Sequence, residues 1–128
     1  MIQQKPILSI LPEKLGICRF DEKSSIPAWA QELNFCSITR TRTELSIVCS
    51  QDEIPAGVLA EKDWRAIKLE GSLGLESVGV IAGLSHPLAD AGISIFNIST
   101  YETNYILVED KNLKKAIEVL STFCEIRQ

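Results

Sequence analysis

The residues best suited to chemistry form a short segment at the start of a predicted helix, Glu76-Ser77-Val78-Gly79-Val80. The first turn of a helix carries unpaired backbone N–H groups and the positive end of the helix dipole, so a carboxylate can bind there. Gly79 has no Cβ, which lets a small ligand approach the backbone, and Ser77 is a favourable N-cap residue. The segment therefore predicts a carboxylate site, although plain helix capping by Ser77 explains the same residues.

A second polar segment, Ser99-Thr100-Tyr101-Glu102-Thr103-Asn104, lies between two apolar runs. Its hydroxyl and amide groups could bind the ammonium or side chain of a ligand, whereas an ordinary hairpin turn uses the same residue types. A zwitterion needs donors for its carboxylate and acceptors for its ammonium on opposite walls of a site. The two segments together therefore favour a small zwitterionic ligand.

Catalytic patterns are missing from the sequence. The single histidine, His86, precedes a proline within a predicted helix, and we expect it to be exposed or to pack on that helix. The chain has no GxSxG, HExxH or P-loop motif, and Gly71-Ser72-Leu73-Gly74 lacks the third glycine of a dinucleotide fingerprint. We therefore expect no catalytic residues, no cofactor and no enzymatic activity.

The four cysteines, Cys18, Cys36, Cys49 and Cys124, include no CxxC pair and fall in strand-like or apolar stretches. Buried free cysteines behave as small hydrophobic residues, so we expect free thiols here. Zinc binding is disfavoured by this spacing and by the presence of one histidine only.

Composition excludes several classes of partner. The 128 residues carry a net charge of -4, and their basic residues are scattered, which argues against a nucleic-acid partner. The apolar stretch before Pro12 is too short for the core of a signal peptide. No apolar run approaches the roughly 20 residues needed to span a bilayer. These features predict a soluble cytoplasmic protein with no membrane partner.

The elements that must position the two polar segments are clearest in the second half of the chain. Apolar residues recur every three or four positions in two stretches and alternate in the others. The pattern predicts strands at residues 64–71, 93–100, 105–109 and 123–127 and helices at 78–91 and 111–121. Pro87 would bend the first helix locally. This βαββαβ order is that of the ferredoxin-like unit, an α+β fold.

The first half of the chain matches the second when it is shifted by about sixty residues, as repeat analysis requires. Ser37-Ile38-Thr39 then lies over Asn97-Ile98-Ser99, and Val48 lies over Val108. The shift predicts two repeats, at residues 1–62 and 63–128. The first repeat would keep only shortened helices at 27–33 and near 54–58, with an additional strand at 15–20.

The segments LSIVC, WRAIKLEG and GVIAGLSHPLADAGISIFNISTYETNYILV closely resemble tandem ACT domains of small bacterial proteins. They are also similar to the paired ACT domains of aspartate kinases and of cytosolic arginine sensors. The resemblance implies two ferredoxin-like ACT units side by side, with a free amino acid bound at the seam between units. It also implies a regulatory module that forms a homodimer and acts on an enzyme in trans. The alternative is an interaction or dimerisation domain with a vestigial pocket.

The resemblance also implies which residues meet the ligand. The loop before the helix would contact the backbone groups of the amino acid, and the end of the hairpin would cover it. The residues that match these positions are Glu76, Ser77, Val78 and Gly79 in the loop and Thr100, Tyr101 and Asn104 in the hairpin. Many relatives carry an aspartate where this chain has Asn104, and an amide brings no charge for a basic ligand.

Overall fold

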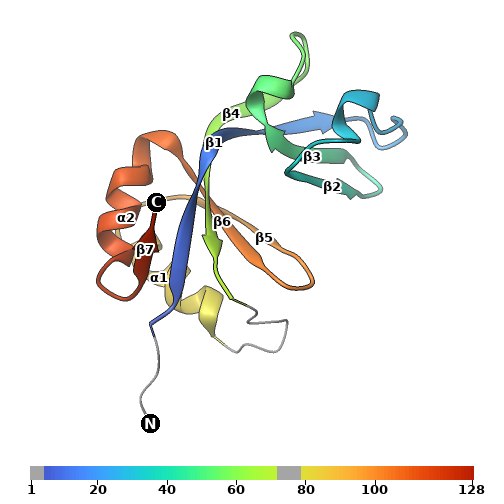
Figure 1. The fold of residues 1–128 in the computed structure, drawn as a ribbon. Coiled ribbons are helices and arrows are strands. Elements are labelled where there is room, and N and C mark those ends of the chain that lie inside the picture. Colours follow the sequence, from blue (N-terminus) through green and yellow to red (C-terminus); the bar gives the residue numbers. More distant parts are fainter. Residues whose placement is uncertain (1–4, 72–78) are drawn as a thin grey trace. The chain divides into compact units, whose positions relative to one another are not determined.

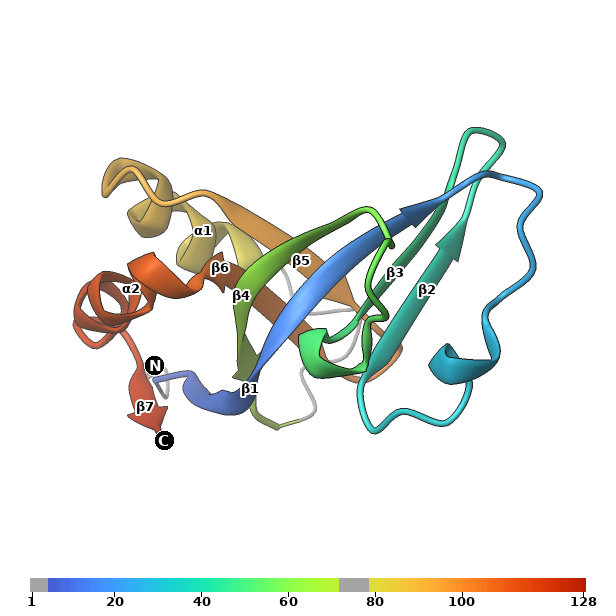
Figure 2. The same ribbon diagram turned by 90° about the horizontal axis from the view of Figure 1, so that it is seen from above.

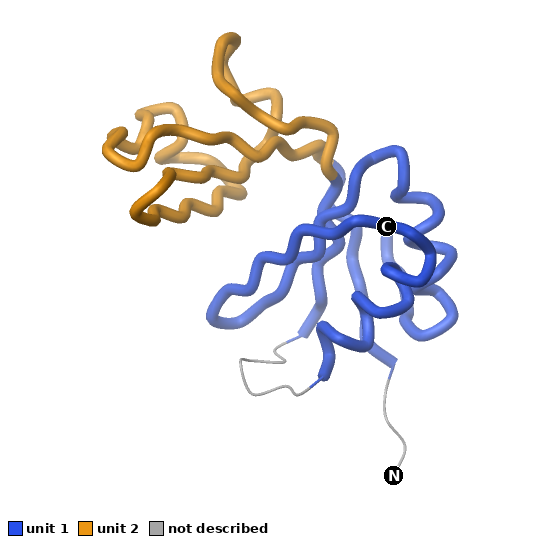
Figure 3. The backbone as a smooth tube through the Cα atoms, turned by 180° about the vertical axis from the view of Figure 1, so that it is seen from behind, with its two compact units in different colours: residues 1–12, 65–128 blue, residues 13–64 orange. Residues whose placement is uncertain are grey.

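A computed structural model describes residues 5–71 and 79–128 of the chain. The chain folds into two compact units (Figure 3). Unit 1 contains residues 1–12 and 65–128, and unit 2 contains residues 13–64. The N-terminal segment therefore belongs to the same unit as the C-terminal half. The division into two sequence repeats at residues 1–62 and 63–128 remains a prediction.

Two long strands, β1 (Ile7–Phe20) and β4 (Ala60–Leu69), are drawn in Figures 1 and 2, and the limits of the units fall within both of them. They are neighbours in the sheet, and backbone hydrogen bonds join them at both ends. The N–H of Arg19 donates to the carbonyl of Leu59 at 3.0 Å, and that of Glu70 donates to the carbonyl of Ile7 at 2.8 Å. The strand predicted at residues 15–20 is thus the second half of a longer one.

Unit 1 has the predicted βαββαβ order. After β4 come α1 (Val80–Asp90), β5 (Ile95–Ser99), β6 (Asn104–Glu109), α2 (Leu113–Leu120) and β7 (Glu125–Arg127). The strands lie in the order β7-β1-β4-β6-β5. The closing strand β7 pairs in parallel with the first residues of β1, with Ile7 opposite Glu125.

The core of unit 1 lies between one face of its strands and the two helices (Figure 2). The buried residues of α1 are Leu84 and Leu88, and those of α2 are Ala116 and Leu120. The members of each pair are four residues apart and therefore lie on one face of their helix. These side chains pack with alternate strand residues, which are Leu8, Ile67, Leu69, Ile106 and Val108. Burial of these apolar groups is the main stabilising term of the unit.

Unit 2 has the strand order β2-β3-β1-β4, with β2 at Cys36–Arg40 and β3 at Leu45–Ser50. In place of helices it has two single 3-10 turns, η1 (Ala28–Ala30) and η2 (Gln51–Glu53). The shortened helix predicted at 27–33 is therefore one turn only. The segment predicted to keep a turn or so near 54–58 is a single turn, in which the N–H of Val58 donates to the carbonyl of Pro55 at 3.4 Å. Pro55 and Gly57, whose φ is +91°, prevent a helix there.

The β2–β3 and β5–β6 hairpins have the same register. Ser37 lies opposite Val48 in the first hairpin, and Phe96 lies opposite Leu107 in the second. Each residue of the second pair is 59 positions after its counterpart in the first pair. The shift of sixty expected from the sequence is therefore wrong by one residue in these hairpins. A slip of one residue matters because alternate side chains point to opposite faces of a sheet.

Candidate functional site

Helix α1 begins with an open N-terminus. Gly79 occupies the N-cap position with φ +78° and is exposed, and a Cβ added to it would meet nothing within 4 Å. The first intrahelical bond runs from the N–H of Gly83 to the carbonyl of Gly79 at 2.9 Å. The N–H groups of Val80, Ile81 and Ala82 therefore have no partner inside the helix.

The predicted loop residues Glu76, Ser77 and Val78 lie outside the described residues. Helix α1 starts at Val80, two residues after the predicted start, and Gly79 rather than Ser77 is its N-cap. Its left-handed backbone explains why a glycine stands there, because most side chains are strained at positive φ. The predicted ligand cradle at this helix start stays a prediction.

The turn between β5 and β6 uses Thr100 for its own closure. The backbone N–H of Thr100 donates to the carbonyl of Thr103 at 2.8 Å, and its hydroxyl accepts from the N–H of Thr103 at 3.0 Å. The same hydroxyl lies 3.1 Å from the carbonyl of Thr103. Tyr101, at the tip of the turn, is 83% exposed. Thr100 therefore stabilises the turn, and Tyr101 projects into solvent.

A row of three polar side chains lies on the helix-covered face of the hairpin. Asn97 Nδ2 donates to Ser99 Oγ at 3.0 Å, and Ser99 Oγ donates to Asn104 Oδ1 at 2.6 Å. Asn97 lies opposite Ile106, whose side chain is in the core below α1 and α2. Because side chains alternate along a strand, Ser99 and Asn104 share this face.

The orientation of Asn104 determines what it can offer a ligand. Its amide oxygen already accepts from Ser99, so its NH2 group is the part left to bind other molecules. Such a donor suits a carboxylate, and the ammonium of a ligand would have to share the oxygen. Asn97 was not among the predicted site residues. Its position could have identified it, because it is a polar residue in an otherwise apolar strand, two residues before Ser99.

The structure thus brings some predicted residues together and leaves one apart. Thr100, Tyr101 and Asn104 belong to one hairpin end. Gly79 lies at the start of α1 in the same unit, and within residues 5–71 and 79–128 no hydrogen bond joins it to the hairpin.

The remaining reactive side chains are four cysteines and one histidine. Cys18, Cys36, Cys49 and Cys124 are free thiols, as predicted, and three of them are buried while Cys36 is half-buried. His86 is exposed and lies 3.3 Å from Asp90 on the next turn of α1. No group of three or more His, Cys, Asp or Glu residues in the described ranges is placed to hold a metal ion. No helix in those ranges is long and apolar enough to cross a membrane.

Comparison with known families identifies the second half of the chain. The ACT domain family model matches residues 59–122, which is half of the sequence. A second family model, which describes an N-terminal domain, matches residues 13–57. The chain therefore belongs to the ACT domain family, as the resemblance of its segments predicted.

Individual relatives agree with this assignment. A crystal structure of an Agobacterium tumefaciens protein is 35% identical, has a TM-score of 0.90 and covers 97% of this chain and 93% of its own. The human protein "cytosolic arginine sensor for mTORC1 subunit 1" is 29% identical over 107 residues, or 77% of this chain and 32% of the sensor. The chain thus spans about a third of these curated relatives.

More distant structures share the fold alone. The regulatory subunit of aspartate kinase from Thermus thermophilus has a TM-score of 0.60 at 13% identity. That comparison covers 88% of this chain and 92% of the subunit. This likeness supports the ACT fold of the chain.

Proposed function

We propose that this protein is a regulatory module that binds a free amino acid and does not catalyse a reaction. The observation that carries the proposal is the open start of α1, where exposed Gly79 precedes three N–H groups without a helical partner. Membership of the ACT family and likeness to a protein named as an arginine sensor support it. The ligand carboxylate would bind these N–H groups and the helix dipole.

The opposite wall would come from the end of the β5–β6 hairpin. Backbone carbonyls near Ser99, together with the Asn104 oxygen that also accepts from Ser99, would meet the ammonium of the ligand. The NH2 group of Asn104 would donate to its side chain. Thr100 and Tyr101 would flank it, and Glu76, Ser77 and Val78 would complete the loop around the carboxylate. Charge-assisted hydrogen bonds contribute roughly 1.5–3 kcal/mol each. A few of them give micromolar to millimolar affinity once the costs of binding are paid.

The preferred ligand has an uncharged side chain in this proposal. Asn104 offers an amide where a carboxylate would be needed to pair with a basic group. Asn97 and Ser99, its neighbours in the polar row, are also neutral. Arginine, the ligand in the names of the curated relatives, would therefore bind less well here than a neutral amino acid.

We further propose that the chain contains two ACT repeats, at residues 1–62 and 63–128. The matching hairpins support a duplication, in which unit 2 lost its helices. A second ACT unit would form the far side of the ligand seam, and a homodimer would bring further units. The module would act in the cytoplasm on an enzyme in trans.

A protein-interaction domain with a vestigial pocket is the second candidate. Two observations favour it, since the Thr100 hydroxyl is used in its own turn and the Asn104 oxygen is used by Ser99. In that case the edge strands or a helix face would bind the partner, and no amino acid would be needed.

A thermal-shift screen of the full chain against the twenty amino acids separates the two candidates. A ligand that binds the native state alone stabilises it by RT ln(1 + [L]/Kd), or about 2.7 kcal/mol at 100 times Kd. The sensor proposal predicts a rise in Tm with at least one amino acid at about 10 mM, which is 100 times a Kd of about 0.1 mM. No rise with any of the twenty at that concentration contradicts it and favours the interaction domain.

A further inference from the structure

Three of the four cysteines lie together in unit 2. Cys36 in β2 is directly opposite Cys49 in β3. Cys18 in β1 lies opposite Ile47, two residues before Cys49 in β3. All three belong to one face of the strands, which packs on Ala30 and Ile54. The fourth cysteine, Cys124, is buried in the separate core of unit 1.

Directly opposite residues in an antiparallel pair have Cβ atoms about 4.5–5.5 Å apart. A disulfide needs a Cβ separation of about 3.5–4.5 Å. Cys36 and Cys49 therefore require a shift of at most about 1–2 Å to form one. Because the two strands are already paired, such a bond would close on a fixed register rather than on a flexible loop.

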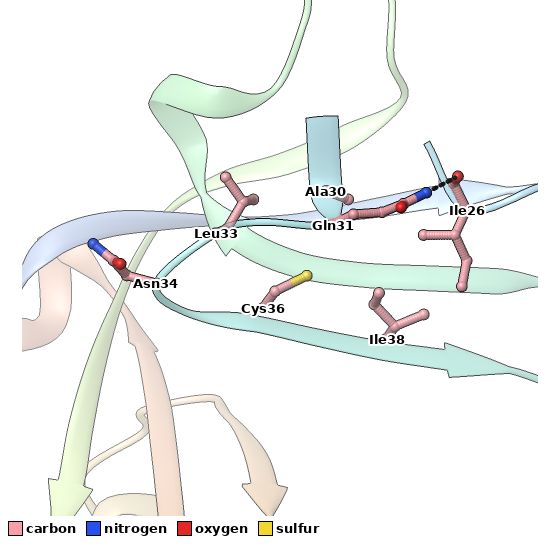
Figure 4. A pocket seen from close by; sticks show the side chains of 7 residues that line it. All are labelled: Ile26, Ala30, Gln31, Leu33, Asn34, Cys36 and Ile38. Carbon is pink, nitrogen blue, oxygen red and sulfur yellow. Dashed lines mark hydrogen bonds between the residues drawn. The ribbon is translucent and has the colours of Figure 1, made fainter. Parts of the chain in front are cut away.

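Cys36 is also the member of the cluster that a reagent can reach. Its side chain lines a groove with a volume of about 680 Å³, together with Leu33 and Ile38 (Figure 4). Cys18 and Cys49 are only 1% and 0% exposed. An accessible thiol with a buried neighbour is the arrangement in which a first thiol reacts and a second one resolves the product.

The groove has a lining that suits a small peptide-like molecule. Its remaining lining residues are Ile26, Ala30, Gln31 and Asn34. The amides of Gln31 and Asn34 can donate hydrogen bonds to carboxylates or peptide carbonyls. No charged residue lines the groove among the described residues, so an anionic peptide would meet no repelling carboxylate.

We propose that Cys36 is a modification site for low-molecular-weight disulfides of the glutathione type, and that Cys49 resolves the adduct into a Cys36–Cys49 disulfide. In the first step the Cys36 thiolate attacks one sulfur of glutathione disulfide, the S–S bond breaks and one glutathione leaves as a thiolate. In the second step Cys49 attacks the Cys36 sulfur, and the second glutathione leaves. The two protein thiols are oxidised, the reagent is reduced to two molecules of glutathione, and the thiol protons go to the leaving groups.

Burial raises the pKa of the Cys36 thiol, and it is the main cause that raises the pKa of Cys49 to about 12. Little of either thiol is thiolate at neutral pH, so both exchange steps are slow. The informative measurement is therefore the identity of the product at the end of the reaction. The full chain is incubated in native buffer with an excess of glutathione disulfide, and its peptides are mapped by mass spectrometry without reduction. We expect a peptide that links Cys36 to Cys49, while Cys124 remains a free thiol.

Two variants test the order of the steps. Cys49→Ala should stop the reaction at one glutathione on Cys36, and Cys124→Ala, the matched control, should give the same linked product as the wild type. Glutathione on Cys124 before Cys36, or no product at Cys36 in the wild type, overturns the proposal. A wild-type chain that keeps glutathione on Cys36 overturns the resolving role of Cys49. The wild-type map decides the matter by itself if Cys49→Ala does not fold.

Discussion

Thr41 and Thr100 each bond to the backbone of the residue three positions later and so close their hairpins, although one lies in unit 2 and the other in unit 1. The N–H of Thr41 donates to the carbonyl of Glu44 at 2.8 Å, and the N–H of Thr100 donates to that of Thr103, also at 2.8 Å. Each threonine hydroxyl also accepts a backbone N–H, from Glu44 at 3.2 Å and from Thr103 at 3.0 Å. The two turns are therefore closed in a similar way.

Removing either hydroxyl should destabilise the protein to a similar extent. Thr100→Ala loses the two hydrogen bonds between its hydroxyl and the backbone of Thr103, and Thr41→Ala loses those between its hydroxyl and the backbone of Thr43 and Glu44. Each such bond contributes about 0.5–1.5 kcal/mol. Urea denaturation followed by circular dichroism measures the change in the free energy of unfolding. Thr41→Ser and Thr100→Ser are the controls because they keep the hydroxyl. Alanine variants as stable as the serine variants would show that these bonds do not stabilise the turns.

Two glycines should respond to alanine in opposite directions. A Cβ on Gly16 would lie 2.5 Å from Ile54 Cδ1, the end of a side chain that must turn to another rotamer within the core of unit 2, so Gly16→Ala should destabilise the protein by about 0.5–1.5 kcal/mol. Gly83 is exposed within α1 and has nothing within 4 Å of a Cβ, so Gly83→Ala should stabilise it by up to about 1 kcal/mol. Thermal unfolding of the two variants measures both changes. The same sign for both would mean that the packing around Gly16 differs from that described.

The buried thiol of Cys49 should make the protein sensitive to alkali. Burial, and then the neighbouring Cys18 and Cys36, raise the pKa of Cys49 from 9.0 to about 12 in the folded state, with a smaller contribution from Glu53. The native state thus keeps a proton that the unfolded chain loses. This contribution to stability is complete below pH 9 and is lost as the pH rises toward 12.

The loss from this one group is at most about 1.4 kcal/mol per pH unit. Urea denaturation at pH values of about 8 and about 10 should therefore show a smaller loss of stability in Cys49→Ala than in the wild type. Subtracting the two slopes removes the effect of the other cysteines. Equal slopes would mean that Cys49 titrates in the folded protein as it does in the unfolded chain.

Asn104→Asp tests the preference for an uncharged ligand. The aspartate keeps an oxygen that can accept from Ser99, and it adds the negative charge that pairs with a basic side chain. The thermal shift produced by arginine should then increase relative to that of neutral amino acids. Asn97→Asp, one step along the same polar row, is the control and should change this preference less. An equal effect of both variants would place the ligand side chain elsewhere.

Most of unit 1 could be predicted from the sequence because its local patterns agree with its packing. Leu84 and Leu88, and likewise Ala116 and Leu120, recur at helical spacing and are buried as expected. The hairpin of β5 and β6 was predicted from two apolar runs around a polar turn, and Ile106 and Val108 are in the core. Local preference and tertiary structure point the same way there.

Unit 2 was harder because its elements depend on contacts far along the chain. The sequence match placed Ile38 over Ile98, yet the pairing of the strands makes Asn97 its counterpart. Ile38 is 39% exposed and Ile98 is 9% exposed, so hydrophobic identity misled the alignment by one residue. The sharing of β1 between units also carried no local signal, since its pairing with β4 is set by tertiary structure.

The candidate site could be predicted only in part. The position of Gly79 at a helix start followed from local pattern, but its positive φ is a backbone property that the sequence does not fix. This φ also changes how the site must be tested, because leucine at Gly79 would strain the backbone as well as fill the space. Asparagine tolerates the left-handed region and still adds a side chain at the helix start.

Calorimetric titration of Gly79→Asn is the most direct test of amino-acid binding at the start of α1. Gly92→Asn is the matched control, because Gly92 has φ +75°, has nothing within 4 Å of a Cβ and lies just after the other end of the same helix. With the amino acid that gives the largest thermal shift, we predict that Gly92→Asn binds like the wild type. Gly79→Asn should bind at least about tenfold more weakly, a loss of about 1.4 kcal/mol. Wild-type affinity in Gly79→Asn would contradict a ligand site at this helix start.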